Sequence, residues 1–467
     1  MAFSSATFLF LFLPVVFLLH LALPGIKIKN ILLTAASLLF YAWGEGLYVL
    51  LMIISVFINW IAGLLIAKYD RFAKLVTALS VVLNIGMLFV YKYAGFFVQT
   101  INLIPGINLP EISIRLPLGI SFFTFQVLSY VIDVYRDRSM VNKSYFSTLL
   151  YISFFPQLIA GPIVKYHDVN LQIENRTLNA DIVSQGIRRF IIGLSKKLLI
   201  ADVTAAVVDD VFAMQVSEIS GLCAWLGAVL YIFQIYFDFS GYSDMAIGIG
   251  KMFGFDFKEN FNYPYTALGI RDFWRKWHIS LSTWFREYLY IPLGGNRKGG
   301  VRTYINLFIV FLATGFWHGA NFTFIVWGIY NGLLIVAERA GFIKIKNKVL
   351  NHIYTVFAVI IGFVIFRADT LTYAFSYIAR MFTPAAFTNG FADALSYCTP
   401  YLIFTAVVAL VLCMPVLNLL KQKTEKLPAK AAMAVKGVTY PLCLILLLAC
   451  IMVLAANTYS PFIYFRF

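Results

Sequence analysis

Long apolar runs constrain this chain more than any other feature of its sequence. A helix that crosses a lipid bilayer needs about 20 mostly apolar residues, and lipid offers the backbone no hydrogen-bond partner outside such a helix. The sequence therefore predicts an all-α polytopic membrane protein with about 11 or 12 transmembrane helices. The runs cover residues 6–23, 31–47, 48–67, 75–98, 116–134, 186–208, 221–249, 303–317, 321–338, 351–367, 396–420 and 436–456.

The overall composition agrees with a membrane location. Hydrophobic residues make up 61% of the 467 residues and charged residues 13%, against about 45–50% and 25% in a soluble domain. This balance excludes a disordered chain, a fibrous repeat and a soluble enzyme. The first run lacks a basic leader and an Ala-x-Ala site, so we expect it to be retained as a span. Two stretches, 146–164 and 264–292, mix aromatic residues with Pro, Gly and charge, and are expected to form re-entrant or interfacial helices.

The positive charge is explained by the membrane rather than by a nucleic acid. Lys and Arg number 37 against 22 Asp and Glu, a net charge of +15. The basic clusters fall in loops that the helix map places on one side, which predicts that this side is cytoplasmic and that both termini are outside. The expected partner of these surfaces is membrane lipid, with no nucleic acid. The clusters are Lys27/Lys29, Lys68/Arg71/Lys74, Arg136/Arg138/Lys143, Arg271 through Arg302, Arg339 through Lys348, and a loop from Lys421 to Lys436.

Domain and cofactor signals are few. The sequence shows no internal repeat of the kind found in secondary transporters and no soluble segment longer than a loop, so residues 1–467 are predicted to form one integral membrane domain. The five cysteines lie in or beside apolar runs without a CxxC pair, which predicts neither a disulfide framework nor a metal site.

The densest group of polar residues lies between Asp238 and His318. His318 stands between Trp317 and Gly319, flanked by two very apolar runs. Desolvation keeps an imidazole neutral near pH 7, which suits it to accept a proton from a hydroxyl group. Gly315 and Gly319 could let a substrate approach the ring, or could simply pack two helices as a G-x-x-x-G pair.

A second histidine, His278, follows a basic and aromatic segment that contains Arg275 and Lys276. This segment could be an amphipathic helix at the cytoplasmic surface, or it could bind the phosphates of an anionic donor. Asp238 and Asp244 could orient a histidine or form salt bridges. The remaining histidines, His20, His167 and His352, have little polar company in the sequence and are expected to be incidental.

Several irregular strings make the chain similar to a known family. It resembles the membrane-bound O-acyltransferase (MBOAT) superfamily and, within it, the bacterial branch of alginate O-acetylation membrane proteins. The resemblance extends over a motif-bearing core of about residues 119–338. The strings are GISFFTFQ at 119–126, SY at 129–130, DVYR at 133–136, FFPQLIAGP at 154–162, DFSGYSD at 238–244, FWRKWH at 273–278, YIPLGG at 290–295 and FWHG at 316–319.

This resemblance implies a fold and a site. The fold is a ring of transmembrane helices with re-entrant or interfacial helices around a central funnel. His318 matches the catalytic histidine of the family, and His278 matches its second functional histidine. We expect Arg275, Lys276 and Arg286 to contact the phosphates of the donor. Trp317, Tyr242 and Asp244 are expected to form the wall around the histidines.

The resemblance also implies an activity. It is that of an O-acyltransferase, specifically an O-acetyltransferase, in the bacterial cytoplasmic (inner) membrane. The donor would be cytoplasmic acetyl-CoA, with no bound cofactor, and His318 would act as general base or as a transient acyl carrier. The acetyl group would pass to an extracytoplasmic partner resembling an SGNH hydrolase, which would modify an alginate-like exopolysaccharide or peptidoglycan. The alternatives are transfer of D-alanine from a carrier protein to teichoic acid, a transporter or flippase of a lipid-linked intermediate, and a non-catalytic scaffold.

Overall fold

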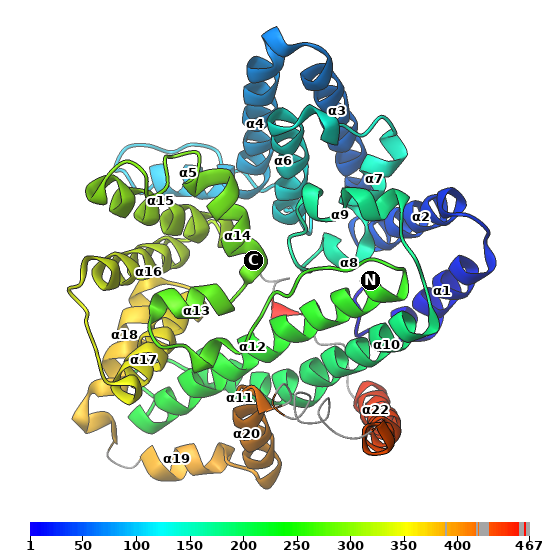
Figure 1. Cartoon of the computed structure of the whole chain (residues 1–467). Coiled ribbons are helices and arrows are strands. Elements are labelled where there is room, and N and C mark those ends of the chain that lie inside the picture. Colours follow the sequence, from blue (N-terminus) through cyan, green and yellow to red (C-terminus); the bar gives the residue numbers. More distant parts are fainter. Residues whose placement is uncertain (388–389, 417–418, 420–428, 457–461, 464–467) are drawn as a thin grey trace. The chain divides into compact units, whose positions relative to one another are not determined.

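The fold is helical throughout the part of the chain that the structure describes. The computed structural model describes residues 1–387, 390–416, 419, 429–456 and 462–463, and among these no residue lies in a β-strand (Figure 1). Of the basic loop predicted from Lys421 to Lys436, residues 421–428 lie outside the described residues, and residues 429–436 belong to the helix Ala429–Ala456. The prediction of an all-α membrane protein is confirmed.

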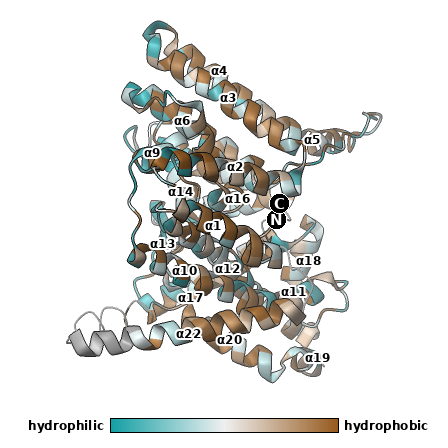
Figure 2. Ribbon diagram, turned by 90° about the vertical axis from the view of Figure 1, so that its right-hand side faces the viewer, coloured by the Kyte–Doolittle hydropathy of each residue, from teal (hydrophilic) through white to brown (hydrophobic). Residues whose placement is uncertain are grey.

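The described residues contain eight or nine candidate spans by length and composition, against the 11 or 12 expected for the whole chain. Within the described residues eight helices are long and apolar enough, or nine if the bent pair Gly390–Tyr397 and Pro400–Leu412 forms one span. Three of the predicted runs differ from a single long α-helix: the first yields the shorter apolar helix Phe8–Ala22, α6 (Ile120–Arg136) has 17 residues, and α10 (Ala180–Ser195) continues through a π-helical turn at Lys196–Ala201 into a further helix. Figure 2 shows α3, α4 and α20 as predominantly hydrophobic along their length.

One compact unit comprises residues 1–190 and 243–259. Its helices α3, α4 and α6 pack against one another, and α2 packs against α7. Buried Asn59 on α3 and Asn84 on α4 exchange side-chain hydrogen bonds of 3.3 and 2.8 Å. The helices that lie wholly in this unit are α1 (Leu13–Ala22), α2 (Ile26–Glu45), α3 (Tyr48–Lys68), α4 (Asp70–Lys92), α5 (Ala94–Ile101), α6, α7 (Tyr145–Ser153), α8 (Phe155–Leu158) and α9 (Tyr166–Glu174).

The second unit comprises residues 191–242 and 260–467, and it contains both candidate histidines. Helices α10 and α12 (Gly221–Met252) contribute residues to both units. The other helices of the second unit are α11 (Asp202–Ala213), α13 (Ile270–Lys276), α14 (Ile279–Phe285), α15 (Gly300–His318), α16 (Phe322–Ala340), α17 (Lys348–Arg367), α18 (Leu371–Phe382), α19 (Gly390–Tyr397), α20 (Pro400–Leu412) and α22 (Ala429–Ala456).

Helices α15 and α16 form a closely packed hairpin in the second unit (Figure 1). A Cβ atom on Gly315 would collide with the carbonyl oxygen of Phe324 and would lie 3.2 Å from the Cα atom of Gly328. Asn321 begins α16 by accepting a hydrogen bond from the backbone N–H of Thr323, which satisfies a donor that the helix itself cannot. Gly315 therefore serves helix packing, one of the two roles that the sequence left open.

The stretch 264–292 contains no helix long enough to cross a membrane. It consists of a 3₁₀ turn at Pro264–Thr266, the two seven-residue helices α13 and α14, and a π-helical turn at Arg286–Tyr290. Glu338 on α16 holds the first turn of α13, because its two carboxylate oxygens accept hydrogen bonds from the backbone N–H groups of Ile270 and Arg271 at 2.6 and 3.1 Å. This cap anchors the segment that leads to His278.

Candidate functional site

His278 occupies a sharp break between α13 and α14. Its backbone lies in the left-handed region at φ 45°, and in the described chain the only other residue besides glycine with positive φ is Tyr263. Such a conformation costs roughly 1–2 kcal/mol for a side chain with a Cβ atom. Hydrogen bonds hold the break: the backbone N–H of Ile279 donates to the carbonyl oxygen of Asn260 at 2.9 Å, and that of Asn262 donates to Lys276 at 2.9 Å.

The imidazole of His278 is buried, with 1% of the residue exposed. Its ring meets that of Phe239 edge-on at a centroid distance of 4.6 Å, and its Nδ1 atom lies 3.2 Å from Oδ1 of Asn260. Burial lowers the pKa of His278 from its ordinary value of 6.5 to about 3, because desolvation disfavours the imidazolium. His278 is therefore neutral at physiological pH.

His318 ends α15 inside a cage of aromatic rings. Its ring centroid lies 5.0 Å from that of Phe366 on α17 and 5.2 Å from that of Trp327 on α16, and both pairs meet edge-on. The ring centroid of Phe324 lies 6.4 Å from that of His318. Gly319 leaves room for this ring, because a Cβ atom on Gly319 would collide with it. The cage excludes water from most of the imidazole, which is 7% exposed.

Trp317 connects the two histidines. Its indole centroid lies 6.0 Å from the ring of His278 and 5.0 Å from that of His318, and the residue is 4% exposed. The structure thus brings together three of the residues that the sequence singled out, from two segments 40 residues apart. Two imidazoles on either side of an indole could accept and donate protons in a site that water barely reaches.

A cationic cavity opens on the same segment. It has a volume of about 640 Å³, and its lining includes Arg275 and Arg286, two of the residues that the sequence analysis singled out, together with Ile279, the residue after His278. Three further arginines face it, and no carboxylate is among the described residues that line it. The three arginines are Arg271, Arg297 and Arg339. A guanidinium group binds phosphate oxygens with two parallel hydrogen bonds, so five of them favour a polyphosphorylated ligand.

Three other predicted site residues have partners of their own. The amine of Lys276 lies 2.9 Å from a carboxylate oxygen of Asp272, one helical turn before it. Tyr242 is buried and packs edge-on against Phe462 at 4.8 Å. Asp244 belongs to the first unit and forms an ion pair with Arg189 at 2.8 Å.

Asp238 forms part of a buried ion pair, one of the roles that the sequence left open for it. One carboxylate oxygen lies 2.6 Å from the amine of Lys197, and the other accepts a hydrogen bond from the backbone N–H of Ile463 at 2.9 Å. Lys197 also pairs with Asp202 at 2.8 Å. Charges buried this deeply need such partners, because removing one of them would leave the others buried and uncompensated.

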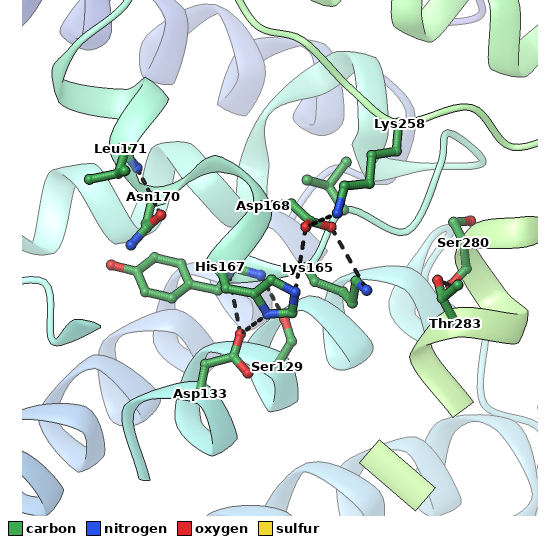
Figure 3. Close-up of polar contacts among 12 residues, drawn as sticks. Ser129, Asp133, Lys165, His167, Asp168, Asn170, Leu171, Lys258, Ser280 and Thr283 are labelled. Carbon is green, nitrogen blue, oxygen red and sulfur yellow. Dashed lines mark hydrogen bonds and ion pairs between the residues drawn. The ribbon is translucent and has the colours of Figure 1, made fainter. Parts of the chain in front are cut away.

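The sequence interpretation missed a charged cluster around His167. Figure 3 shows this ring between two carboxylates: Nδ1 lies 2.9 Å from Asp133, and Nε2 lies 3.4 Å from Asp168, which also pairs with Lys258. The hydrogen bond with Asp133 raises the pKa of His167 above its ordinary value. The expectation that His167 has little polar company is therefore wrong. The sequence could not reveal the pair, because Asp133 lies 34 residues earlier in the chain. Among the described residues, this cluster included, no group of three or more His, Cys, Asp or Glu side chains could hold a metal ion.

Comparison with known proteins gives one family. The sequence model of the MBOAT, membrane-bound O-acyltransferase family matches residues 121–366. The chain is 46% identical over 394 residues to a probable alginate O-acetylase of Pseudomonas aeruginosa, covering 82% of this chain and 75% of the relative. It is 39% identical over 419 residues to a peptidoglycan O-acetyltransferase of Helicobacter pylori, covering 81% and 79%.

A more distant similarity concerns a different acyl group. The chain is 30% identical over 267 residues to a teichoic acid D-alanyltransferase of Bacillus subtilis, covering 53% of this chain and 65% of the relative. Both candidate histidines and the arginines of the cavity lie within the residues that the family model matches.

Proposed function

Because the chain belongs to the membrane-bound O-acyltransferase family, we propose that it is an O-acetyltransferase of the bacterial cytoplasmic membrane. It takes acetyl groups from acetyl-CoA in the cytoplasm and passes them across the membrane for O-acetylation of an extracytoplasmic polysaccharide. Relatives named as alginate and peptidoglycan O-acetylating enzymes, at 46% and 39% identity, support the acetyl group and the kind of acceptor.

The arginine cavity is the observation that carries the proposal. Coenzyme A carries its phosphates on a 3′-phospho-ADP head, and five guanidinium groups around about 640 Å³ suit such a group in charge and size. Arg275 and Arg286 contact these phosphates, with Arg271, Arg297 and Arg339 completing the cavity. Lys276 contributes less, because its amine already pairs with Asp272. The lining residue Ile279 places this cavity next to the turn of His278.

The chemistry requires a base and a dry site. His318 removes the proton from the hydroxyl group of the partner that first receives the acetyl group, and the oxygen of that hydroxyl then attacks the carbonyl carbon of the thioester. The carbon–sulfur bond breaks, and the thiolate of coenzyme A leaves and takes up a proton. General-base catalysis of this kind is typically worth about 10²–10⁴-fold in rate. His278 assists from the other side of Trp317, and the indole of Trp317 together with Tyr242 forms the wall of the site.

The acceptor lies outside the cytoplasm and is reached through a second protein. We infer a partner that resembles an SGNH hydrolase, to which the acetyl group passes and which then modifies hydroxyl groups of an alginate-like exopolysaccharide or of peptidoglycan. Where His318 acts as a transient acyl carrier instead of a base, its imidazole holds the acetyl group between the donor and the partner.

The second candidate is transfer of D-alanine from a carrier protein. The similarity to the Bacillus subtilis teichoic acid D-alanyltransferase supports it, but over 267 residues and at 30% identity. The arginine cavity favours coenzyme A, because it offers guanidinium groups to more than one phosphate, whereas a carrier protein presents a single phosphopantetheine.

The donor experiment separates these two functions. Purified protein in lipid nanodiscs is incubated with either radiolabelled acetyl-CoA or a carrier protein charged with radiolabelled D-alanine, and label transferred to protein or to added polysaccharide and partner is counted. We expect transfer from acetyl-CoA. Transfer from the charged carrier alone would replace the proposal with the second candidate, and transport of a lipid-linked sugar without acyl transfer would replace both.

A further inference from the structure

A single oxygen atom, Oδ1 of Asn260, receives three polar contacts at the His278 turn, one from a backbone N–H and two from side chains. The backbone N–H of Ser280 donates to it at 3.1 Å, the hydroxyl of Ser280 donates to it at 2.8 Å, and Nδ1 of His278 lies 3.2 Å away. All three residues are buried. The hydroxyl of Ser280 also lies 3.4 Å from Nδ1.

These contacts determine how both side chains are oriented. A backbone N–H can only donate, so the atom of Asn260 that faces Ser280 N has to be the amide oxygen and not the amide nitrogen. The same oxygen faces Nδ1 of His278, and because an amide oxygen can only accept, Nδ1 has to carry the hydrogen. The neutral imidazole then has its lone pair on Nε2.

We propose that Asn260 is a positioning residue for acetyl transfer, which holds His278 in the Nδ1–H tautomer so that Nε2 is the nitrogen able to accept a proton. This inference rests on the proposed function of His278. Asn260 has no need to touch the substrate. It acts through the imidazole, as the buried carboxylate does in a serine-protease triad.

The backbone of Asn260 also contacts the turn that holds His278. His278 lies in the left-handed region as the residue before α14, and the Asn260 carbonyl oxygen accepts from the next residue, Ile279. The main chain of Asn260 therefore fixes the break, while its side chain fixes the ring. Phe239 from α12, Trp317 from α15 and Ser280 from α14 also face the ring, and none of these three carries a charge. Asn260 Oδ1 lies nearer to Nδ1 than the hydroxyl of Ser280 does, at 3.2 against 3.4 Å.

Two variants of Asn260 separate orientation from packing. Asn260→Asp keeps the oxygen that accepts all three contacts and adds a negative charge, whereas Asn260→Leu keeps the approximate shape and removes the acceptor. Asn84→Leu is the matched control, because Asn84 is also buried and bonded to another side chain but belongs to the first unit. A purely structural Asn260 would behave like this control.

The tautomer is read by ¹⁵N NMR of histidine-labelled protein in nanodiscs, with His278→Ala to assign the signal. The chain has five histidines, which keeps the spectrum readable. We expect His278 to show the Nδ1–H tautomer in the wild type and in Asn84→Leu, and a mixture of tautomers in Asn260→Leu. A wild-type signal with the hydrogen on Nε2, or an unchanged tautomer in Asn260→Leu, would overturn the proposal.

Kinetics test the consequence for transfer. Asn260→Leu should lower kcat about 10²-fold with little change in KM for acetyl-CoA. Asn260→Asp should recover most of the rate above neutral pH, with the acid limb of its pH profile moved to higher pH because the carboxylate stabilises the imidazolium. Equal losses in Asn260→Leu and Asn84→Leu would contradict the proposal. If wild-type protein and His278→Ala transfer acetyl equally well, the proposed function of His278 fails, and the NMR result still decides the tautomer.

Discussion

The imidazole of His318 meets the indole of Trp327 edge-on, with ring centroids 5.2 Å apart and ring planes at 86°. Trp327 is buried on α16, and the contact joins the last residue of α15 to the helix that packs against it. The position of His318 therefore depends on how closely the α15–α16 hairpin packs.

Replacing Gly315 by alanine should destabilise the hairpin. The added methyl group would collide with the carbonyl oxygen of Phe324. This oxygen belongs to the backbone, so no change of side-chain rotamer can relieve the collision. Overpacking of this kind typically costs about 1–3 kcal/mol. Thermal unfolding of the purified protein measures the effect. Gly86→Ala on α4 is the matched control, because its Cβ atom would meet nothing within 4 Å and should leave the midpoint unchanged or slightly higher. Equal midpoints for the two variants would contradict the packing role.

Replacing Arg286 by alanine should weaken donor binding. Hydrogen bonds to charged groups contribute about 1.5–3 kcal/mol, so we expect KM for acetyl-CoA to rise about tenfold or more with a smaller change in kcat. Initial rates over a range of acetyl-CoA concentrations measure this. Arg302→Ala serves as the control, because Arg302 is exposed on α15 and does not line the cavity. A KM that responds equally to both substitutions would mean that the cavity is not the donor site.

The pair of His167 and Asp133 should make stability depend on pH. The folded state raises the pKa of His167 above its unfolded value of about 6.5, since the carboxylate of Asp133 stabilises the imidazolium. Its stabilisation is then fully present below the unfolded pKa and is lost as the pH rises through the folded pKa. His167→Gln should therefore lower the unfolding midpoint more at pH 5.5 than at pH 9. A difference from wild type that does not change with pH would exclude this linkage.

The sequence predicted the helical class and the two histidines, but not what surrounds them. Apolar runs of about 20 residues identify helices directly, and the FWRKWH and FWHG strings identified His278 and His318 through a family resemblance. Asn260, whose side-chain oxygen lies next to Nδ1 of His278, is 18 residues earlier in the chain. The two residues meet because the chain turns back between them, so no periodic sequence pattern links them.

The other residues that the sequence left open were decided by contacts between distant segments. Gly315 serves helix packing because Gly328 and Phe324 lie opposite it, and Asp238 pairs with Lys197 from another helix. The sequence also did not reveal the π-helical turn at Lys196–Ala201, which lies between α10 and α11 without a break in the helical chain. Hydropathy detects the apolar run but not such a local change in helix type.

The central claim is that His318 is the base for acetyl transfer, and one measurement tests it most directly. Purified wild type, His318→Ala and the control His352→Ala are reconstituted in nanodiscs at equal amounts, checked for equal unfolding midpoints, and incubated with radiolabelled acetyl-CoA, partner and polysaccharide. We predict that wild type and His352→Ala transfer label at similar rates and that His318→Ala loses at least about 10²-fold. Transfer by a well-folded His318→Ala protein at the wild-type rate would contradict the account.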